Sequence, residues 1–296
     1  MIRYITPAVT PLTEDGQIDV QAVHDLYHFL INKGVDGILV LGSIGEFFAF
    51  TMEEKKTLIQ AAVAAVDHRV PLIVGTGSTV RADVVNLSRF ALEAGADAVM
   101  IVPPYYFALT DRDVFAWFDG LAQEIPGRVY LYNFPDRTGY SIAPSVVAAL
   151  AEKHPNIVGI KDTIGGMDHT REVIKAVKKI RPDFEVYSGF DDSFSHNVLS
   201  GGNGCVAGLS NIVPEITHAL AEAARNGDFA GMQKGQQQID RLMDVYTVGA
   251  PFVPFVKAAV GLRGIPVSSK VTQPLPTPTE EQLEALRRIL AKEITL

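Results

Sequence analysis

Cysteine and long apolar runs are scarce in this sequence of 296 residues. It contains one cysteine, Cys205, and no stretch of 18 consecutive apolar residues. A single cysteine excludes an intramolecular disulfide framework and fits a reducing compartment. Cys205 lies in an apolar segment, so we expect it to be a small core residue. Without a long apolar run or a signal-peptide pattern in the first seven residues, we expect a cytoplasmic protein that does not span a membrane.

An excess of positive charge is also absent. The chain has 26 lysine and arginine residues against 34 aspartate and glutamate residues, which gives a formal net charge of −8. This balance argues against nucleic acid or an anionic membrane as the main partner. His24 and His28 stand four residues apart, but no third ligand accompanies them, so no metal site is expected. We expect small molecules as partners.

Short apolar runs alternate with amphipathic segments along most of the chain. Val20–Asn32 and Val80–Ala94 have the apolar spacing of helices, and Thr51–Glu54 has the pattern of a capping box. Eight strand–helix units in a chain of this length predict an α/β fold, a (β/α)₈ barrel. The alternative, a doubly wound open sheet, is less favoured because no dinucleotide-binding glycine fingerprint is present. The eight predicted strands are Ile5–Val9, Gly37–Leu41, Pro71–Gly75, Ala98–Pro103, Arg128–Asn133, Ile157–Lys161, Phe184–Ser188 and Gly204–Leu209.

Helical patterns continue after the last predicted strand. They cover Pro214–Arg263 and Thr279–Ile294, and a proline-rich connector, Pro266–Pro278, separates them. We therefore expect residues 1–226 to form the barrel. Residues 227–296 are expected to form a C-terminal helical extension that packs on the barrel within a single structural unit.

Lys161 occupies an unusual position at the end of the predicted strand Ile157–Lys161. A strand between helices in such a fold is buried on both faces and is normally almost wholly apolar. A lysine in an apolar pocket loses hydration and becomes a neutral amine more easily, and the neutral amine is a nucleophile for carbonyl groups. The alternative is a lysine whose ammonium group reaches solvent at the strand end.

Polar residues gather where the predicted strands end, which is where barrels of this kind build active sites. Tyr132 ends the strand before Lys161, and its phenol could move protons during attack on a carbonyl; the alternative is an aromatic core residue. The turn Gly42–Glu46 contains two glycines and Ser43, and its amides could bind the carboxylate of a small keto acid. The alternative is a plain strand-to-helix turn. The five polar segments are Gly42–Glu46, Pro103–Tyr106, Tyr132–Pro135, Lys161–Thr163 and Ser188–Asp192.

These segments together resemble the dihydrodipicolinate synthase / N-acetylneuraminate lyase family of class I pyruvate-dependent aldolases. The resemblance covers nearly the whole chain. It rests on four motifs: G-[ST]-x-G-E at Gly42–Glu46, P-Y-Y at Pro104–Tyr106, Y-N-x-P-x-x-[ST]-G at Tyr132–Gly139, and G-[IV]-K at Gly159–Lys161.

The resemblance implies roles for several residues. Lys161 would form a Schiff base with pyruvate, so pyruvate is bound covalently and no metal or organic cofactor is expected. Tyr132 would donate and accept protons and would be positioned by Ser43. Tyr106 would reach into the active site of a neighbouring subunit, which implies a homotetramer built as a dimer of dimers. The substrate-binding residues implied are Ile44, Gly45, Arg137, Thr163, Gly189, Asp191, Asp192 and Gly208.

The second substrate is harder to infer. Arg137 matches the arginine with which synthases of the family bind a substrate carboxylate. Condensation of pyruvate with aspartate semialdehyde is therefore the reaction that the resemblance favours. Ile44 replaces a second hydroxyl residue of the synthases, and Phe190 before Asp191 is typical of sugar-acid lyases. A 2-keto-3-deoxy sugar-acid aldolase or dehydratase, or an N-acetylneuraminate lyase-like aldolase, is therefore the alternative. A barrel that binds keto acids without catalysis is the alternative from a different class.

Overall fold

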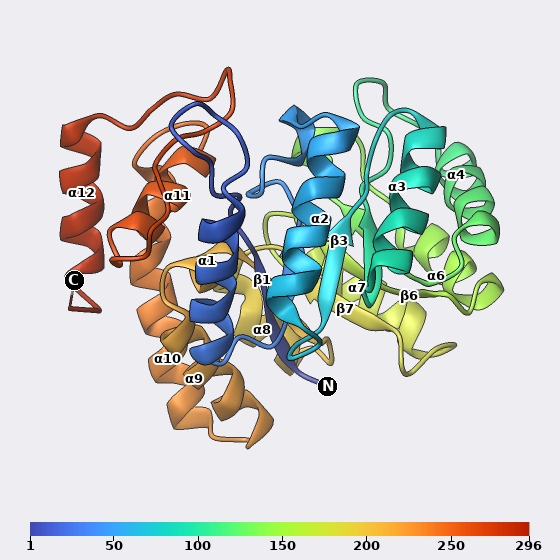
Figure 1. Cartoon of the computed structure of the whole chain (residues 1–296). Helices are drawn as coiled ribbons and strands as arrows, with labels where there is room; N and C mark the ends of the chain where they lie inside the picture. Colours follow the sequence, from blue (N-terminus) through green and yellow to red (C-terminus); the bar gives the residue numbers. More distant parts are fainter. Residues whose placement is uncertain (296) are drawn as a thin grey trace. The chain divides into compact units, whose positions relative to one another are not determined.

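Eight parallel strands follow one another in chain order around a closed barrel in the computed structural model, which describes residues 1–295. Figure 1 labels several of these strands and most of the helices along the chain. The predicted (β/α)₈ barrel is confirmed, and each predicted strand overlaps an observed one. The strands are β1 (Arg3–Pro7), β2 (Ile38–Val40), β3 (Leu72–Gly75), β4 (Ala98–Ile101), β5 (Arg128–Asn133), β6 (Ile157–Asp162), β7 (Glu185–Ser188) and β8 (Gly204–Val206).

Helices follow the strands, and local sequence signals set several of their ends. The side chain of Thr51 accepts from the amide of Glu54, and Glu54 accepts from Thr51, so the predicted capping box is confirmed. Gly95 ends another helix with φ 116°, a conformation that favours glycine. The helices are α1 (Val20–Asn32), α2 (Met52–Val66), α3 (Arg81–Ala94), α4 (Asp111–Glu124), α5 (Pro135–Thr138), α6 (Pro144–Lys153), α7 (Asp168–Lys178), α8 (Phe194–Leu199), α9 (Pro214–Arg225), α10 (Phe229–Leu242), α11 (Val253–Gly261) and α12 (Glu280–Leu290).

The chain divides into two compact units. One comprises residues 1–3 and 73–206, and the other comprises residues 4–72 and the chain from Ala207 onward. The first unit contains most of β3, all of β4–β8, and α3–α8. The second contains β2, most of β1, and α1, α2 and α9–α12. The expected boundary between residues 226 and 227 remains a prediction.

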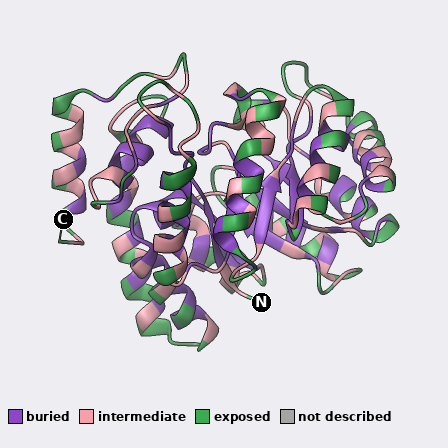
Figure 2. Ribbon diagram, viewed as in Figure 1, coloured by how far each residue is buried: buried purple, intermediate pink, exposed green. Residues whose placement is uncertain are grey.

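Within each unit the strands are buried, and most helices have a buried side and an exposed side (Figure 2). In α7, for example, Val173, Ile174 and Val177 are buried, whereas Lys175 on the other side is exposed. Cys205 is fully buried, as expected for a small core residue.

A polar cluster in the first unit shares the strand face of Lys161, because alternate strand residues face the same side. Glu185 accepts hydrogen bonds from the hydroxyls of Tyr130 at 2.5 Å and Tyr187 at 3.0 Å, and pairs with Arg3 at 3.2 Å. Burial and the charge of Glu185 raise the pKa of both phenols, so they stay protonated donors. Gly159 leaves room for this cluster: a Cβ atom there would lie 2.6 Å from the Glu185 carbonyl oxygen and 2.7 Å from Cε1 of Tyr130.

We expect Gly159→Ala to lower the free energy of unfolding by about 1–3 kcal/mol, because the added methyl group must displace backbone and a buried ring. Gly165→Ala is the matched control, since no atom lies within 4 Å of a Cβ placed there. Its effect should stay within about 0.5 kcal/mol. Urea unfolding followed by circular dichroism measures both. Equal stability of the two variants would contradict the crowding inferred at Gly159.

Candidate active site

Tyr132 and Lys161 lie side by side on β5 and β6. The two strands pair in parallel with Tyr132 opposite Lys161, and on the other side of β6 Lys161 is opposite Tyr187. The Nζ atom of Lys161 lies 4.5 Å from the centroid of the Tyr132 ring, and each residue is 5% exposed. The alternative of an ammonium group extended into solvent therefore does not hold. The structure brings together an amine and a phenol in a buried place.

Asp162 and Asn133, the residues that follow this pair, form a second buried contact on the opposite face of the strands. Asn133 Nδ2 donates to Asp162 Oδ1 at 2.7 Å. The other Asp162 oxygen accepts from Thr170 Oγ1 at 2.6 Å and from His169 Nδ1 at 2.9 Å, both on α7. Because successive strand residues face opposite sides, Asp162 faces the helix and Lys161 faces the barrel interior.

His169 bridges two acceptors. Its Nδ1 faces Asp162, and its Nε2 lies 3.0 Å from the carbonyl oxygen of Ile142. An imidazole can donate from both nitrogens only when it is protonated. Burial opposes that charge, but the hydrogen bond and charge of Asp162 and the Ile142 carbonyl raise the pKa of His169 above its usual value. The two acceptors and the raised pKa both favour the protonated form of His169.

The roles of His169 and Thr170 were not predicted from the sequence. Asp162, next to Lys161, could have indicated them. A carboxylate on a buried strand needs hydrogen-bond partners, and because strand residues alternate between faces, Asp162 points toward the following helix. The start of α7, Asp168-His169-Thr170, supplies those partners.

Thr163 presents a buried hydroxyl two residues after Lys161. It is 4% exposed, and its Oγ1 has no hydrogen-bond partner among residues 1–295. Gly189 makes this arrangement possible, since a Cβ atom there would lie 1.8 Å from that oxygen. Asp191, two residues after Gly189, is 1% exposed and begins a 3₁₀ turn, Asp191–Ser193. The next residue, Asp192, is exposed. Thr163 and Gly189 thus lie together where β6 and β7 end.

Arg137 belongs to the short helix α5 and is exposed. Its guanidinium carbon lies 5.3 Å from the centroid of the Phe134 ring. Phe134 in turn stacks on Tyr132 with ring centroids 5.9 Å apart and an interplanar angle of 28°. Two aromatic rings therefore connect the guanidinium to the buried lysine.

Tyr106 lies on an exposed aromatic loop after β4. It is 88% exposed and has φ 93°, and its ring meets that of Phe107, itself 75% exposed, edge to face at 5.0 Å. The loop is held at its base because the Tyr140 hydroxyl donates to the carbonyl oxygen of Pro104 at 2.5 Å.

The turn Gly42–Glu46 lies in the second unit and is closely packed. A Cβ atom at Gly45 would lie 2.9 Å from the Ala8 carbonyl oxygen, so this position requires glycine. Thr10 Oγ1 donates to the carbonyl oxygen of Gly45 at 2.8 Å. Ile44 is buried, and its Cδ1 occupies the space next to Gly208, where a Cβ atom would lie 2.5 Å away. The apolar Ile44 is therefore accommodated by Gly208, while Ser43 is partly exposed.

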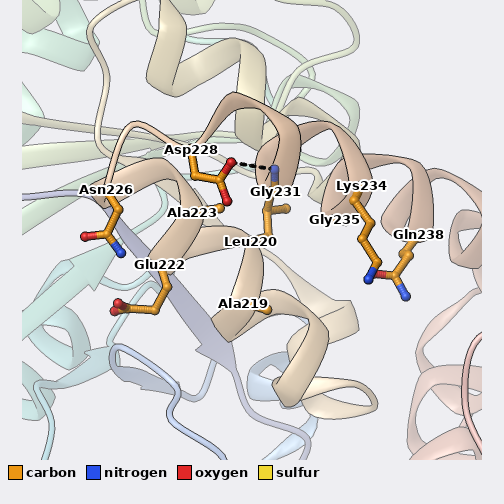
Figure 3. Close-up of a pocket in the computed structure, with 10 residues that line it drawn as sticks. All are labelled: Ala219, Leu220, Glu222, Ala223, Asn226, Asp228, Gly231, Lys234, Gly235 and Gln238. Atoms are coloured by element: carbon orange, nitrogen blue, oxygen red, sulfur yellow. Dashed lines mark hydrogen bonds between the residues drawn. The ribbon is translucent and has the colours of Figure 1, made fainter.

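A groove of about 450 Å³ lies elsewhere, between α9 and α10 (Figure 3). Its polar residues include Glu222, Lys234 and Asp228, and Asp228 caps α10 by accepting from the Gly231 amide at 2.9 Å. None of the predicted site residues lines this groove. The part of the chain described here contains no group of three or more histidine, cysteine, aspartate or glutamate residues arranged to hold a metal ion. Within residues 1–295, no helix is both long and apolar enough to cross a membrane.

Known proteins resemble the chain over nearly its whole length. Residues 1–293 match the model of the dihydrodipicolinate synthetase family. The chain is 37% identical over 292 residues to YagE of Escherichia coli strain K12, which is assigned as a 2-dehydro-3-deoxy-D-gluconate aldolase; the match covers 99% of this chain and 96% of YagE. It is also 37% identical over 287 residues to the 4-hydroxy-tetrahydrodipicolinate synthase of Syntrophus aciditrophicus, covering 97% and 96% of the two chains. The crystal structure of YagE with pyruvate superimposes with a TM-score of 0.95 at 36% identity, covering 99% and 98% of the two chains.

We expect the stability of the protein to depend on pH through His169. A histidine whose pKa is raised on folding contributes its full stabilisation below its usual pKa of about 6.5, and this contribution is lost as pH rises through the raised value. The stability difference between the native protein and His169→Gln should therefore be larger at pH 6 than at pH 9. Urea unfolding at both pH values measures it. A difference that does not change with pH would contradict a protonated His169.

Proposed function

We infer that Lys161 forms the Schiff base in this protein, because the chain belongs to the dihydrodipicolinate synthetase family of class I pyruvate-dependent lyases. The protein is a lyase of this dihydrodipicolinate synthase-like kind. Family members bind pyruvate through a lysine Schiff base and need no external cofactor. The observation that carries the assignment is the buried amine of Lys161 against the ring of Tyr132.

The proposed chemistry follows from a buried amine held next to a phenol. The Lys161 nitrogen attacks C2 of pyruvate, the carbonyl oxygen takes a proton, and loss of water leaves an iminium ion. Loss of a proton from C3 gives an enamine. Its C3 bonds to the aldehyde carbon while the aldehyde oxygen takes a proton, and this restores the iminium ion. Water then attacks the iminium carbon and the product keto acid leaves with release of the amine; cleavage runs the same steps in reverse. Tyr132, positioned by Ser43, is proposed to carry the protons.

The pyruvate carboxylate is proposed to bind at the turn formed by Ser43, Ile44 and Gly45. Backbone amides in a close glycine-containing turn bind anions well. The close approach of Gly45 to Ala8 and the hydrogen bond from Thr10 support this role, because they hold the turn in one conformation.

For the second substrate, we propose a hydroxylated aldehyde, so that the natural reaction is that of a 2-keto-3-deoxy sugar-acid aldolase. The buried Thr163 hydroxyl beside Gly189 favours it, since a buried hydroxyl without a partner is costly unless a substrate hydroxyl bonds to it. Asp191 and Asp192 are proposed to bind further hydroxyls of the aldehyde. Gly208 is proposed to leave room for the side chain of Ile44. The assigned activities of YagE and of Escherichia coli YjhH, a 2-dehydro-3-deoxy-D-pentonate aldolase 35% identical over 289 residues, agree with this choice.

Aspartate semialdehyde is the second candidate, and Arg137 favours it. The guanidinium lies over Phe134, which stacks on Tyr132, so it could bind an acceptor carboxylate at the outer side of the aromatic pair. The synthase from Syntrophus aciditrophicus, at 37% identity, supports this candidate.

We also propose a cytoplasmic homotetramer in which Tyr106 reaches a neighbouring subunit. The exposed aromatic pair of Tyr106 and Phe107 supports an interface, because large exposed aromatic side chains are enriched where proteins associate. A monomeric dihydrodipicolinate synthase variant, 28% identical with a TM-score of 0.93, is among the similar structures, so the fold itself does not require association.

Borohydride reduction in the presence of pyruvate tests the Schiff base. We expect a pyruvyl adduct on the peptide that contains Lys161 and none on the peptide that contains Lys257, which is 0% exposed. Lys161→Met should abolish the adduct and lower kcat/KM at least about 10³-fold, whereas Lys175→Met, at an exposed position, should change neither. Mass mapping that finds no adduct on Lys161 would favour a barrel that binds keto acids without catalysis.

The two acceptors are distinguished by two substitutions. Thr163→Val removes one hydroxyl without changing shape and should lower kcat/KM for 2-keto-3-deoxygluconate cleavage about 3–10-fold, the value of one neutral hydrogen bond. Arg137→Ala should leave that reaction within about 3-fold but impair any condensation with aspartate semialdehyde. Assays of both substrates with the native protein and both variants measure this. A large loss with Arg137→Ala and none with Thr163→Val would favour the synthase.

A further inference from the structure

An ion pair lies fully buried in the second unit and has no part in Schiff-base chemistry. Lys257 on α11 and Glu46 at the end of the Gly42–Glu46 turn are both 0% exposed, and Lys257 Nζ lies 3.0 Å from Glu46 Oε1. The two residues are 211 positions apart in the chain. A buried ion pair contributes little net stability, so its presence calls for another explanation.

Both oxygens of Glu46 are bound. Oε1 accepts from Lys257, and Oε2 accepts from the backbone amide of Thr272 at 2.7 Å and from its hydroxyl at 2.8 Å. Glu46 thereby joins three segments: the turn after β2, helix α11, and the connector that precedes α12. The side chain of Glu46 thus ties the turn to two distant segments.

The backbone of Glu46 depends on this anchoring. Its φ is 58°, in the left-handed region that non-glycine residues seldom adopt. Its amide donates to the carbonyl oxygen of Ser43 at 3.2 Å, which closes the turn over Ile44 and Gly45. When the side chain is released, the strained backbone is free to relax, and the amides between Ser43 and Glu46 turn with it.

We propose that the Lys257–Glu46 pair is a positioning device that holds the Ser43–Gly45 turn in the conformation that binds the keto-acid carboxylate. Through this pair, helix α11 then sets the affinity of the site for pyruvate. This inference rests on the proposed role of the turn as the carboxylate site. Lys257 and Glu46 touch neither substrate nor the reacting amine in this proposal.

Removing Lys257 alone should weaken pyruvate binding more than removing both charges of the pair. Burial lowers the pKa of Lys257, and the charge and hydrogen bond of Glu46 oppose this effect. Lys257→Met leaves the Glu46 carboxylate buried without its cation, which strongly favours rearrangement of the turn. In the double variant Lys257→Met/Glu46→Gln the charge is gone, while a glutamine oxygen can still accept from Thr272. The double variant should therefore bind pyruvate better than Lys257→Met alone.

The test measures borohydride trapping on the Lys161 peptide as a function of pyruvate concentration. We expect Lys257→Met to raise the half-saturating pyruvate concentration at least about 10-fold while the trapping rate at saturation changes less than about 3-fold. The double variant should return to within about 3-fold of the native value. Lys234→Met, the same substitution at an exposed position of α10, is the matched control and should match the native protein.

The outcomes separate the inference from the function on which it rests. A purely structural role would reduce the amount of folded protein without changing half-saturation of the folded fraction, and that result would overturn the inference. Absence of any adduct in the native protein would instead overturn the proposed function. If Lys257→Met does not fold, the same measurement is made on Thr272→Val, which removes the hydroxyl that donates to Glu46. A rise of about 2–5-fold in the half-saturating pyruvate concentration supports the inference, and an unchanged value overturns it.

Discussion

The hydrogen bond between Asn133 and Asp162 is the contact on which the arrangement at the strand ends depends. It joins β5 and β6 immediately after Tyr132 and Lys161, on the opposite face of the strands. Because the strands alternate, a contact on the helix side fixes the spacing of the pair on the inner side. Proton transfer between a phenol and an amine depends steeply on that spacing, since displacement by about 1 Å can cost 10²-fold in rate.

Two pairs of polar side chains lie next to the proposed site residues. His169 Nδ1 lies 2.9 Å from Asp162, the residue after Lys161, and Lys257 Nζ lies 3.0 Å from Glu46 at the end of the turn. Buried pairs of this kind are often replaceable by apolar residues without loss of stability. We propose that their value lies in geometry, because each joins segments that are distant in the chain. In that proposal the first half-reaction at Lys161 depends on residues that do not touch the substrate.

The sequence predicted the barrel because strand and helix periodicity are local properties. It predicted β8 too long, since Gly208 already begins a 3₁₀ turn, Gly208–Asn211. Contacts such as Lys257 with Glu46 could not be predicted, because they join distant segments and depend on how the helices pack. The position of the Thr163 hydroxyl, which has no hydrogen-bond partner among residues 1–295, likewise depends on Gly189 at the end of the neighbouring strand. The sequence therefore predicted Lys161 and Tyr132 as site residues, and Ser43 as the residue that positions Tyr132. It did not predict the contacts of Asp162 with His169 and of Glu46 with Lys257, because both depend on the packing of helices.

A crystal structure of the protein soaked with pyruvate would show directly whether Lys161 forms the Schiff base. We expect continuous electron density from Nζ of Lys161 to C2 of pyruvate, with the pyruvate carboxylate at the amides of the Ser43–Gly45 turn. Pyruvate bound without a covalent link, or linked to a different lysine, would contradict it.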